Sequence, residues 1–347
     1  MSGVRPLAVA LAGCGGFARH HIEAWSRRPR ARLAALVDPD PAAREAARAL
    51  APGAAAFATL DAALRGGGID LVDVCAGETA HAVLVLAAAR AGIVCISQKP
   101  LTPDLESSIA LVDAVAKLGG KLIVHENWRF RPWFQETRRL IDEGALGAPR
   151  ALTFRFRPGD GAGPGAYADR PPSFRNARRF LIHETGVHFI DVFRFLLGEP
   201  VAVTARLRTV NPAIAGEDAG LVAFEFAGGA VAMLDADRSL DHPARSPRFT
   251  GGTMILEGTD AALRLDGEGR LFLRRAGALG EIEHIYAIPA VGYAGDSVGA
   301  QIDHILDHML DGRPVPNDGQ SYLANIRIEA AIYRAAEEGR TIRIAAA

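Results

Sequence analysis

Glycines near the amino terminus follow the spacing of a dinucleotide-binding loop. Residues 13–18 read Gly-Cys-Gly-Gly-Phe-Ala, which fits the pattern G-x-G-x-x-A after an apolar run. The first glycine permits a tight turn, the second lets the backbone approach a pyrophosphate, and the small alanine lets the next helix pack closely. The amino end of that helix offers unpaired N–H groups and partial positive charge to phosphates. We therefore expect the dinucleotide to contact Gly13, Gly15, Gly16, Phe17 and Ala18.

An acidic residue closes the next apolar segment. Residues 32–37 predict a strand, and Asp38 follows it directly. A carboxylate at this point accepts hydrogen bonds from both ribose hydroxyls and repels a 2′-phosphate. Arg44, on the following expected helix, would instead suit NADP. The sequence therefore predicts NAD as the cofactor, with NADP less favoured.

A lysine follows the fifth expected strand, residues 93–97. Ligands bind at the carboxyl ends of strands in an open α/β sheet, so Lys99 is expected to point towards the nicotinamide. A lysine there can bind a substrate hydroxyl and carry its proton, more readily if burial lowers its pKa. The Lys99–Pro100 bond is a candidate for the cis form. A surface lysine before a helix-starting proline explains the same residues.

An acid and a histidine lie one turn apart in the second half of the chain. Glu184, His188 and Asp191 are spaced i, i+4, i+7 and share one face of the helix expected over residues 183–197. A histidine paired with a carboxylate suits proton transfer. An amphipathic helix with a wet face is the alternative. A zinc site is a further alternative, but no third ligand stands at suitable spacing, and we expect no metal.

Polar residues also follow the sixth expected strand, residues 121–125. Asn127 and Arg129 would face a cleft between domains, where they bind polyol hydroxyls or fix the cofactor. A hinge with one structural salt bridge is the alternative. His81, at the start of the helix after the fourth strand, would cap that helix, pack, or contact the cofactor.

The elements that position these residues change character near residue 125. Residues 1–125 alternate strand and helix, which predicts a doubly wound parallel sheet of the Rossmann type. Residues 126–347 contain seven successive expected strands between residues 201 and 288, which predict an α+β domain with a large, open, mostly antiparallel sheet. We therefore expect a dinucleotide-binding domain, 1–125, and a substrate and oligomerisation domain, 126–347.

The composition excludes several classes of protein. The 347 residues are 49% hydrophobic and 23% charged, as in a soluble enzyme of about two domains, and the net charge of −1 gives no footprint for nucleic acid or an anionic membrane. The apolar run before Cys14 is short for a signal sequence. The three cysteines, Cys14, Cys75 and Cys95, lack metal spacing and predict a reduced, cytoplasmic protein.

The order and spacing of these segments resemble the Gfo/Idh/MocA oxidoreductase family over essentially the whole chain. The resemblance rests on the loop 13–18, Gln98-Lys99-Pro100, Asn127-x-Arg129-Phe130 and the ending Glu329-Ala330-Ala331-x-Tyr333-x-Ala335-x-Glu337-Glu338-Gly339. It implies an NAD-dependent dehydrogenase acting on a sugar or polyol, and an open sheet that forms a homodimer or homotetramer. We expect the cofactor also to contact Asp38, His81, Gln98, Lys99, Pro100 and Asn127, and the substrate to contact Lys99, Trp128, Arg129 and His188.

Two positions depart from the family pattern. The signature E-K-P is Gln98-Lys99-Pro100 here, so an amide replaces a carboxylate before the lysine. The pair D-x-x-x-H maps onto Glu184 and His188, which implies that His188 accepts the proton of the reacting hydroxyl or orients that hydroxyl, with Lys99 as its partner and Glu184 as its orienter. We expect Lys99 and His188 to converge beside the nicotinamide. A redox-neutral lyase or hydrolase with retained NAD is the second hypothesis, and a ligand sensor without activity is the third.

Overall fold

The computed structural model describes residues 5–344, which form two compact units. The first unit joins Met1–Phe130 to Ala290–Ile326, and the second joins Arg131–Pro289 to Arg327–Ala347. Each unit is therefore built from two separate stretches of the chain.

A parallel sheet of six strands, in the order β3-β2-β1-β4-β5-β6, forms the centre of the first unit. The strands are β1 (Leu7–Ala12), β2 (Ala31–Val37), β3 (Ala55–Phe57), β4 (Leu71–Val74), β5 (Val94–Gln98) and β6 (Leu122–His125). Strand β4 is buried along its length, as expected for a sheet that is covered on both faces. The strand order reverses between β1 and β4, so their carboxyl ends flank the place where such sheets bind ligands.

Capping side chains fix where several helices of this unit begin. The helices that connect the strands are α1 (Ala18–Ser26), α2 (Pro41–Leu50), α3 (Leu60–Arg65), α4 (Glu78–Arg90) and α5 (Leu105–Lys117). Asp40, Thr59 and Asp104 each accept a hydrogen bond from a backbone N–H in the first turn of α2, α3 and α5. Such caps satisfy N–H groups that have no partner within the helix.

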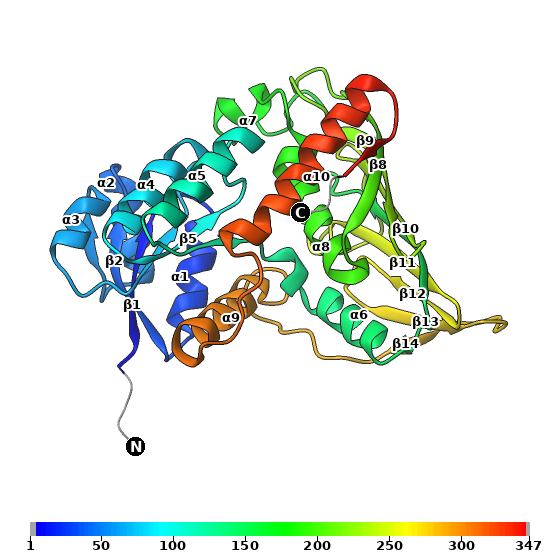
Figure 1. Cartoon of the computed structure of the whole chain (residues 1–347), viewed down its shortest axis with the longest axis horizontal. Helices are drawn as coiled ribbons and strands as arrows, with labels where there is room; N and C mark the ends of the chain where they lie inside the picture. Colours follow the sequence, from blue (N-terminus) through cyan, green and yellow to red (C-terminus); the bar gives the residue numbers. More distant parts are fainter. Residues whose placement is uncertain (1–4, 345–347) are drawn as a thin grey trace. The chain divides into compact units, whose positions relative to one another are not determined.

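A helix from the last quarter of the chain completes the first unit. Helix α9 (Ser297–Asp311, orange in Figure 1) packs beside α1, and Ile302 and Ile305 share a buried core with Val9 and Trp25. At the end of α1, Arg28 donates at 2.9 Å to carboxylates of Asp296 and Asp303, near the start of α9.

The second unit has a sheet of nine strands in the order β14-β13-β12-β11-β7-β10-β9-β8-β15. The strands are β7 (Pro149–Phe156), β8 (Pro200–Arg208), β9 (Ala219–Phe226), β10 (Val231–Asp237), β11 (Gly252–Gly258), β12 (Ala261–Leu265), β13 (Leu271–Arg275), β14 (Ile282–His284) and β15 (Ile342–Arg343). The pairing is antiparallel except between β7 and β10. The fold class expected from the sequence is confirmed.

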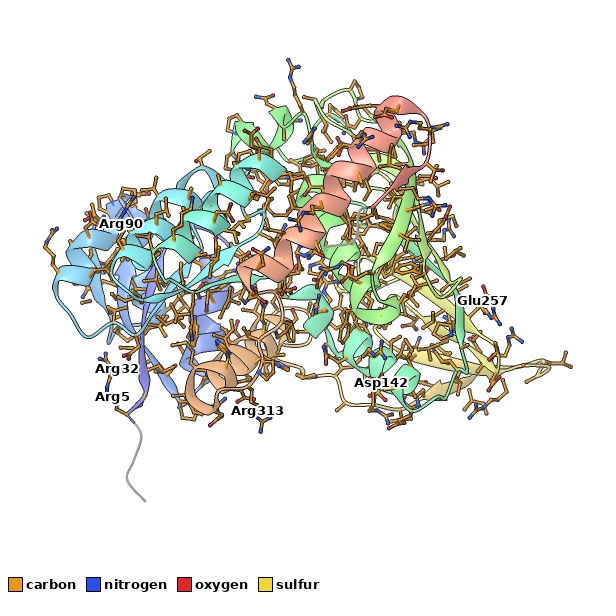
Figure 2. All side chains as sticks on the ribbon, viewed as in Figure 1. Arg5, Arg32, Arg90, Asp142, Glu257 and Arg313 are labelled. Atoms are coloured by element: carbon orange, nitrogen blue, oxygen red, sulfur yellow. The ribbon has the colours of Figure 1, made fainter. Side chains whose placement is uncertain are left out.

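Helices cover one face of this sheet. The unit contains α6 (Pro132–Asp142), α7 (Pro172–Asn176), a π-helical segment η2 (Leu181–Gly186), α8 (Val187–Leu197) and the carboxyl part of α10 (Gly319–Glu338). Phe189 and Phe193 of α8 pack on Phe154 and Phe224 of the sheet, with ring centroids 4.6 and 5.4 Å apart. The opposite face stays open, and Glu257 of β11 points away from the helices in Figure 2.

The structure differs from the sequence expectations in three places. The first stretch of the first unit ends at Phe130 rather than at residue 125. The first unit also includes Ala290–Ile326, because the apolar side of α9 packs in the same core as α1. The expected helix 183–197 starts at Leu181 and is π-helical up to Gly186. The expected strand 282–288 ends at His284.

Candidate active site

The glycine loop leaves room for a ligand on one side only. Gly13 has φ +99°, and a Cβ on it would lie 2.3 Å from the backbone nitrogen of Ala76, so the tight turn requires glycine. A Cβ on Gly15 or Gly16 would meet nothing within 4 Å, and both residues are exposed. Ala18 is buried at the start of α1. The loop is therefore shaped for the close approach of a pyrophosphate.

Asp38 lies beside the glycine loop, as the sequence predicts. One of its carboxylate oxygens accepts from the backbone nitrogen of Cys14 at 2.8 Å, and the other from that of Asp40 at 2.9 Å. Arg44 donates to the carbonyls of Asp38 and Pro39, so its guanidinium supports this turn. These residues fit NAD, because the carboxylate at the loop would repel a 2′-phosphate.

Four buried side chains form a hydrogen-bonded chain behind strands β4, β5 and β6. His21 Nδ1 donates to the Asp73 carboxylate at 2.7 Å, and the amide nitrogen of Gln98 lies 2.7 Å from His21 Nε2 and 3.1 Å from His125 Nδ1. An amide nitrogen only donates, so the imidazole nitrogens that face it accept, and the His125 ring is neutral. Burial also lowers the pKa of His125 to about 3. Gln98 thus supplies hydrogen-bond donors to two buried imidazole nitrogens, which an ionised carboxylate, an acceptor only, could not do.

Lys99 follows this chain at the carboxyl end of β5, and the bond to Pro100 is cis, as the sequence suggested. His81 lies beside it and is buried. Its Nδ1 is 2.9 Å from the Pro100 carbonyl, and its Nε2 is 3.0 Å from the Ala76 carbonyl. His81 therefore ties the turn after Lys99 to the loop after β4, and its contact with the cofactor stays a prediction.

The residues after β6 occupy fixed positions in the first unit. Asn127 is buried and donates from its amide to the Ser297 hydroxyl at 2.8 Å, at the start of α9. Trp128, also buried, begins the short 3₁₀ helix η1 (Trp128–Phe130), and Arg129 is half-buried in it. Their contacts with cofactor and substrate stay predictions.

One buried acid was missing from the expected site. Glu126 directly follows β6, is fully buried, and accepts from the Trp128 backbone nitrogen at 3.3 Å and from the Tyr322 hydroxyl at 3.4 Å. Burial raises its pKa to about 7, against the opposing effects of Lys99 and of the Trp128 N–H. A charged residue placed directly after an apolar strand was the available signal, but the sequence alone does not show that the position is buried.

In the second unit, residues of the last helix hold the segment before His188. The Tyr333 hydroxyl donates to Glu217 at 2.6 Å and accepts from the His183 backbone nitrogen at 3.1 Å. The side chain of His183 is bonded to Glu329 at 2.7 Å. The family-like ending of the chain therefore anchors η2. His188 then lies buried in the first turn of α8, with Asp191 buried three residues later.

A buried arginine joins Glu184 to a distant loop. Arg238 donates to Glu184 at 3.3 Å and to the Thr185 hydroxyl at 2.9 Å, and its other nitrogens reach Asp160 at 2.9 Å and the Tyr167 hydroxyl at 2.6 Å. No motif marked Arg238, because an arginine after a strand is usually exposed. Glu184 thus has a guanidinium partner, and its orientation of His188 stays a prediction.

Within residues 5–344, no group of three or more His, Cys, Asp or Glu side chains is arranged to hold a metal ion. No helix of that described part is both long and apolar enough to cross a membrane.

Comparison with known proteins identifies the family of both halves of the chain. Residues 7–126 match the "Oxidoreductase family, NAD-binding Rossmann fold", and residues 134–264 match the "GFO/IDH/MocA C-terminal domain". A D-apiose dehydrogenase of Paraburkholderia graminis is 30% identical over 96% of this chain and 89% of its own length. An inositol 2-dehydrogenase of Rhizobium meliloti is 33% identical over 66% of this chain and 68% of its own.

A solved structure agrees with this relationship. An oxidoreductase from Agrobacterium radiobacter, in complex with NAD+, L-tartaric acid and magnesium, superimposes with a TM-score of 0.88 at 28% identity, over 97% of this chain and 98% of the other. The expectations of an oxidoreductase and of NAD as its cofactor are confirmed. This chain belongs to the GFO/IDH/MocA family of oxidoreductases, with an NAD-binding Rossmann fold.

Proposed function

We propose that this protein oxidises a hydroxyl of a sugar or polyol with NAD. The observation that carries the proposal is Lys99, held at the carboxyl end of β5 in the NAD-binding unit, with the buried Glu126 following the neighbouring strand. When bound, NAD accepts the hydride from the carbon that bears the hydroxyl. The relatives named for D-apiose and inositol support a sugar or polyol as the substrate class.

Each predicted residue has a defined task in this reaction. The backbone of Gly15 and Gly16 holds the pyrophosphate, and Asp38 binds the ribose hydroxyls. Lys99 binds the substrate hydroxyl and takes up its proton, and His188 assists as proton acceptor or orienting group. Trp128 and Arg129 bind the remaining sugar, together with Asn127 on the cofactor side.

The test follows the absorbance of reduced nicotinamide in mixtures of protein, NAD and single sugars. D-apiose and myo-inositol come first, then other aldoses and polyols, and each is repeated with NADP. We expect turnover with at least one compound, and faster turnover with NAD than with NADP. If no compound is oxidised while purified protein retains tightly bound NAD, a redox-neutral lyase or hydrolase replaces this proposal.

We further propose a homodimer formed through the open face of the nine-stranded sheet. The register places Ala223, Met233, Thr153 and Ile255 in one row across four strands, so three apolar side chains and one threonine lie side by side on this face. Leu221 and Val231 on the same face are 45% and 49% exposed, so a partner that covers this row would bury them as well. Met233→Glu with Ile255→Arg should convert the dimer into a monomer in sedimentation experiments, and a mass unchanged by this pair of substitutions would contradict the interface.

A cytoplasmic location is also proposed. All three cysteines are free and buried, and burial raises the pKa of Cys14 to about 11, so these thiols are protonated and suit a reducing compartment. Fractionation of cells that express the protein tests this location.

A further inference from the structure

Lys99 and Glu126 directly follow two neighbouring strands of the first sheet, β5 and β6. Gln98 of β5 and His125 of β6 are register partners in a parallel pair, and the next residue of each strand is Lys99 or Glu126. Adjacent strands lie about 5 Å apart, so the two residues start from neighbouring points at the carboxyl edge of the sheet. This is the edge at which the cofactor and substrate of such sheets bind.

The surroundings of Glu126 favour a partner with positive charge. The carboxyl group is fully buried, and it accepts hydrogen bonds from Trp128 N–H and the Tyr322 hydroxyl. The charged groups that act on it are Lys99 from the end of β5 and Arg129 from η1. Lys99 has the larger effect of the two, which opposes the cost of burying a negative charge.

The same edge lacks a carboxylate at the neighbouring position. Gln98 replaces the acid of the signature E-K-P, and its amide is committed to His21 and His125. A neutral amide brings no negative charge to balance the positive charge that a lysine acquires when it takes up a proton. The negative charge beside Lys99 therefore comes from Glu126, which follows the adjacent strand β6.

We propose that Glu126 is the positioning residue of Lys99. In this chain the carboxylate beside the lysine comes from the residue after β6, Glu126, and not from the end of β5, where Gln98 stands. The inference rests on the proposed function. In the reaction, the O–H bond of the substrate breaks and an N–H bond forms at Lys99 Nζ, which becomes an ammonium group. The carboxylate of Glu126 fixes that ammonium group and stabilises its charge, and the O–H electron pair becomes the second bond of the product carbonyl. Bound NAD would supply the acceptor for the hydride.

The kinetic test moves the charge between the two positions. Glu126→Gln keeps the shape of the side chain and should lower kcat at least 10-fold, with little change in KM for NAD. The double variant Glu126→Gln with Gln98→Glu returns a carboxylate to the edge and should recover part of the lost kcat. Glu45→Gln, at an exposed site on α2, is the matched control and should leave the rate unchanged.

A substrate-free measurement separates this inference from the proposed function. The chain contains three lysines, Lys99, Lys117 and Lys121, so lysine labelled with ¹³C at Cε gives three NMR signals. In Glu126→Gln, the Lys99 signal should change at a pH at least one unit lower than in the unchanged protein. Lys117 and Lys121 are internal controls that should not move.

The outcomes are distinct. If the Lys99 signal shifts but no protein oxidises any sugar, the pairing stands and the proposed dehydrogenase fails. If the unchanged protein oxidises a sugar and Glu126→Gln retains both its rate and its Lys99 titration, the positioning role is overturned. Bound NAD and a native circular dichroism spectrum in every variant exclude misfolding as the cause.

Discussion

Two glutamates, one in each unit, differ in burial and in the charge beside them. Glu126 in the first unit is fully buried, and burial raises its pKa to about 7. Glu184 in the second unit has a side chain 33% exposed and lies 3.3 Å from Arg238, a guanidinium that stays charged at any working pH. The same carboxyl group is thus poised to change its protonation near neutral pH in one place, and is held beside a permanent positive charge in the other.

The two glutamates therefore have different roles, one beside proton transfer and one in anchoring the backbone. A group that titrates near neutral pH can respond to a proton that moves beside it, as the reaction at Lys99 requires. A carboxylate that is paired with a buried arginine instead fixes backbone in place. Arg238 connects η2, which precedes His188, to the loop that carries Asp160 and Tyr167.

The largest expected effect tests the chemistry assigned to the first unit. Lys99→Met removes the proton acceptor and should lower kcat by about 10²- to 10⁴-fold, as for other general bases. Lys117→Met, at the exposed end of α5, is the matched control. Steady-state rates with NAD and the best sugar measure the effect. A loss smaller than 10-fold would move the proton chemistry away from Lys99.

The next effect tests the second unit. Arg238→Met leaves Asp160 and Glu184 without their buried partner and should lower the free energy of unfolding by about 3–5 kcal/mol, measured by denaturant titration. Arg248 lies 3.5 Å from the same Asp160, but its side chain is 61% exposed. Arg248→Met should therefore cost no more than about 1 kcal/mol. Equal losses in the two variants would refute the view of Arg238 as a buried anchor.

The pH dependence of stability tests the buried state of Glu126. Glu126 has a pKa of about 7 in the folded protein against 4.5 for an ordinary glutamate, so the folded state binds more protons between these values. Stability should therefore fall as the pH rises from 4.5 to 7, by about 3 kcal/mol from this group. Denaturation curves of Glu126→Gln should lack this decline, because its amide does not titrate. A decline of equal size in both proteins would assign it to other groups.

The smallest effect concerns the loop that Arg238 holds. Tyr167→Phe removes a hydroxyl that donates to Asp160 at 2.7 Å and accepts from Arg238 at 2.6 Å. The ring contacts with Phe174 and Phe180 remain, so the expected loss is about 1 kcal/mol in the free energy of unfolding. The same denaturant titration measures it, and a loss as large as that of Arg238→Met would show that the hydroxyl, not the arginine, holds the loop.

Local patterns predicted most of the fold and part of the site. The glycine loop, Asp38 and Lys99 follow strand ends, and a strand end fixes a position in a parallel sheet, so these residues could be placed from the sequence. Arg238 and Glu126 could not. Their importance arises from burial and from partners far along the chain, such as Asp160 and Tyr322, and no periodicity records such distant contacts.

The π-helical segment shows a second kind of limit. The sequence predicted an ordinary helix over residues 183–197, with Glu184, His188 and Asp191 on one face, but residues 181–186 are π-helical. The wider turn follows from tertiary bonds at its start, where Glu217 accepts from the backbone nitrogens of Phe180 and Ile182. Glu217 lies in the loop before β9, so a contact with a distant loop accompanies the departure from ordinary helical geometry.

The discontinuity of the first unit has a consequence for how the protein forms during synthesis. Trp25 and Val9 leave the ribosome before Ile302 and Ile305, which share their core and come 277 to 296 positions later in the chain. The NAD-binding half therefore stays incomplete, with apolar surface uncovered, while the whole nine-stranded sheet is being made. Truncating the chain after residue 289 should leave a product that aggregates or recruits chaperones, even though it still carries every residue of the glycine loop.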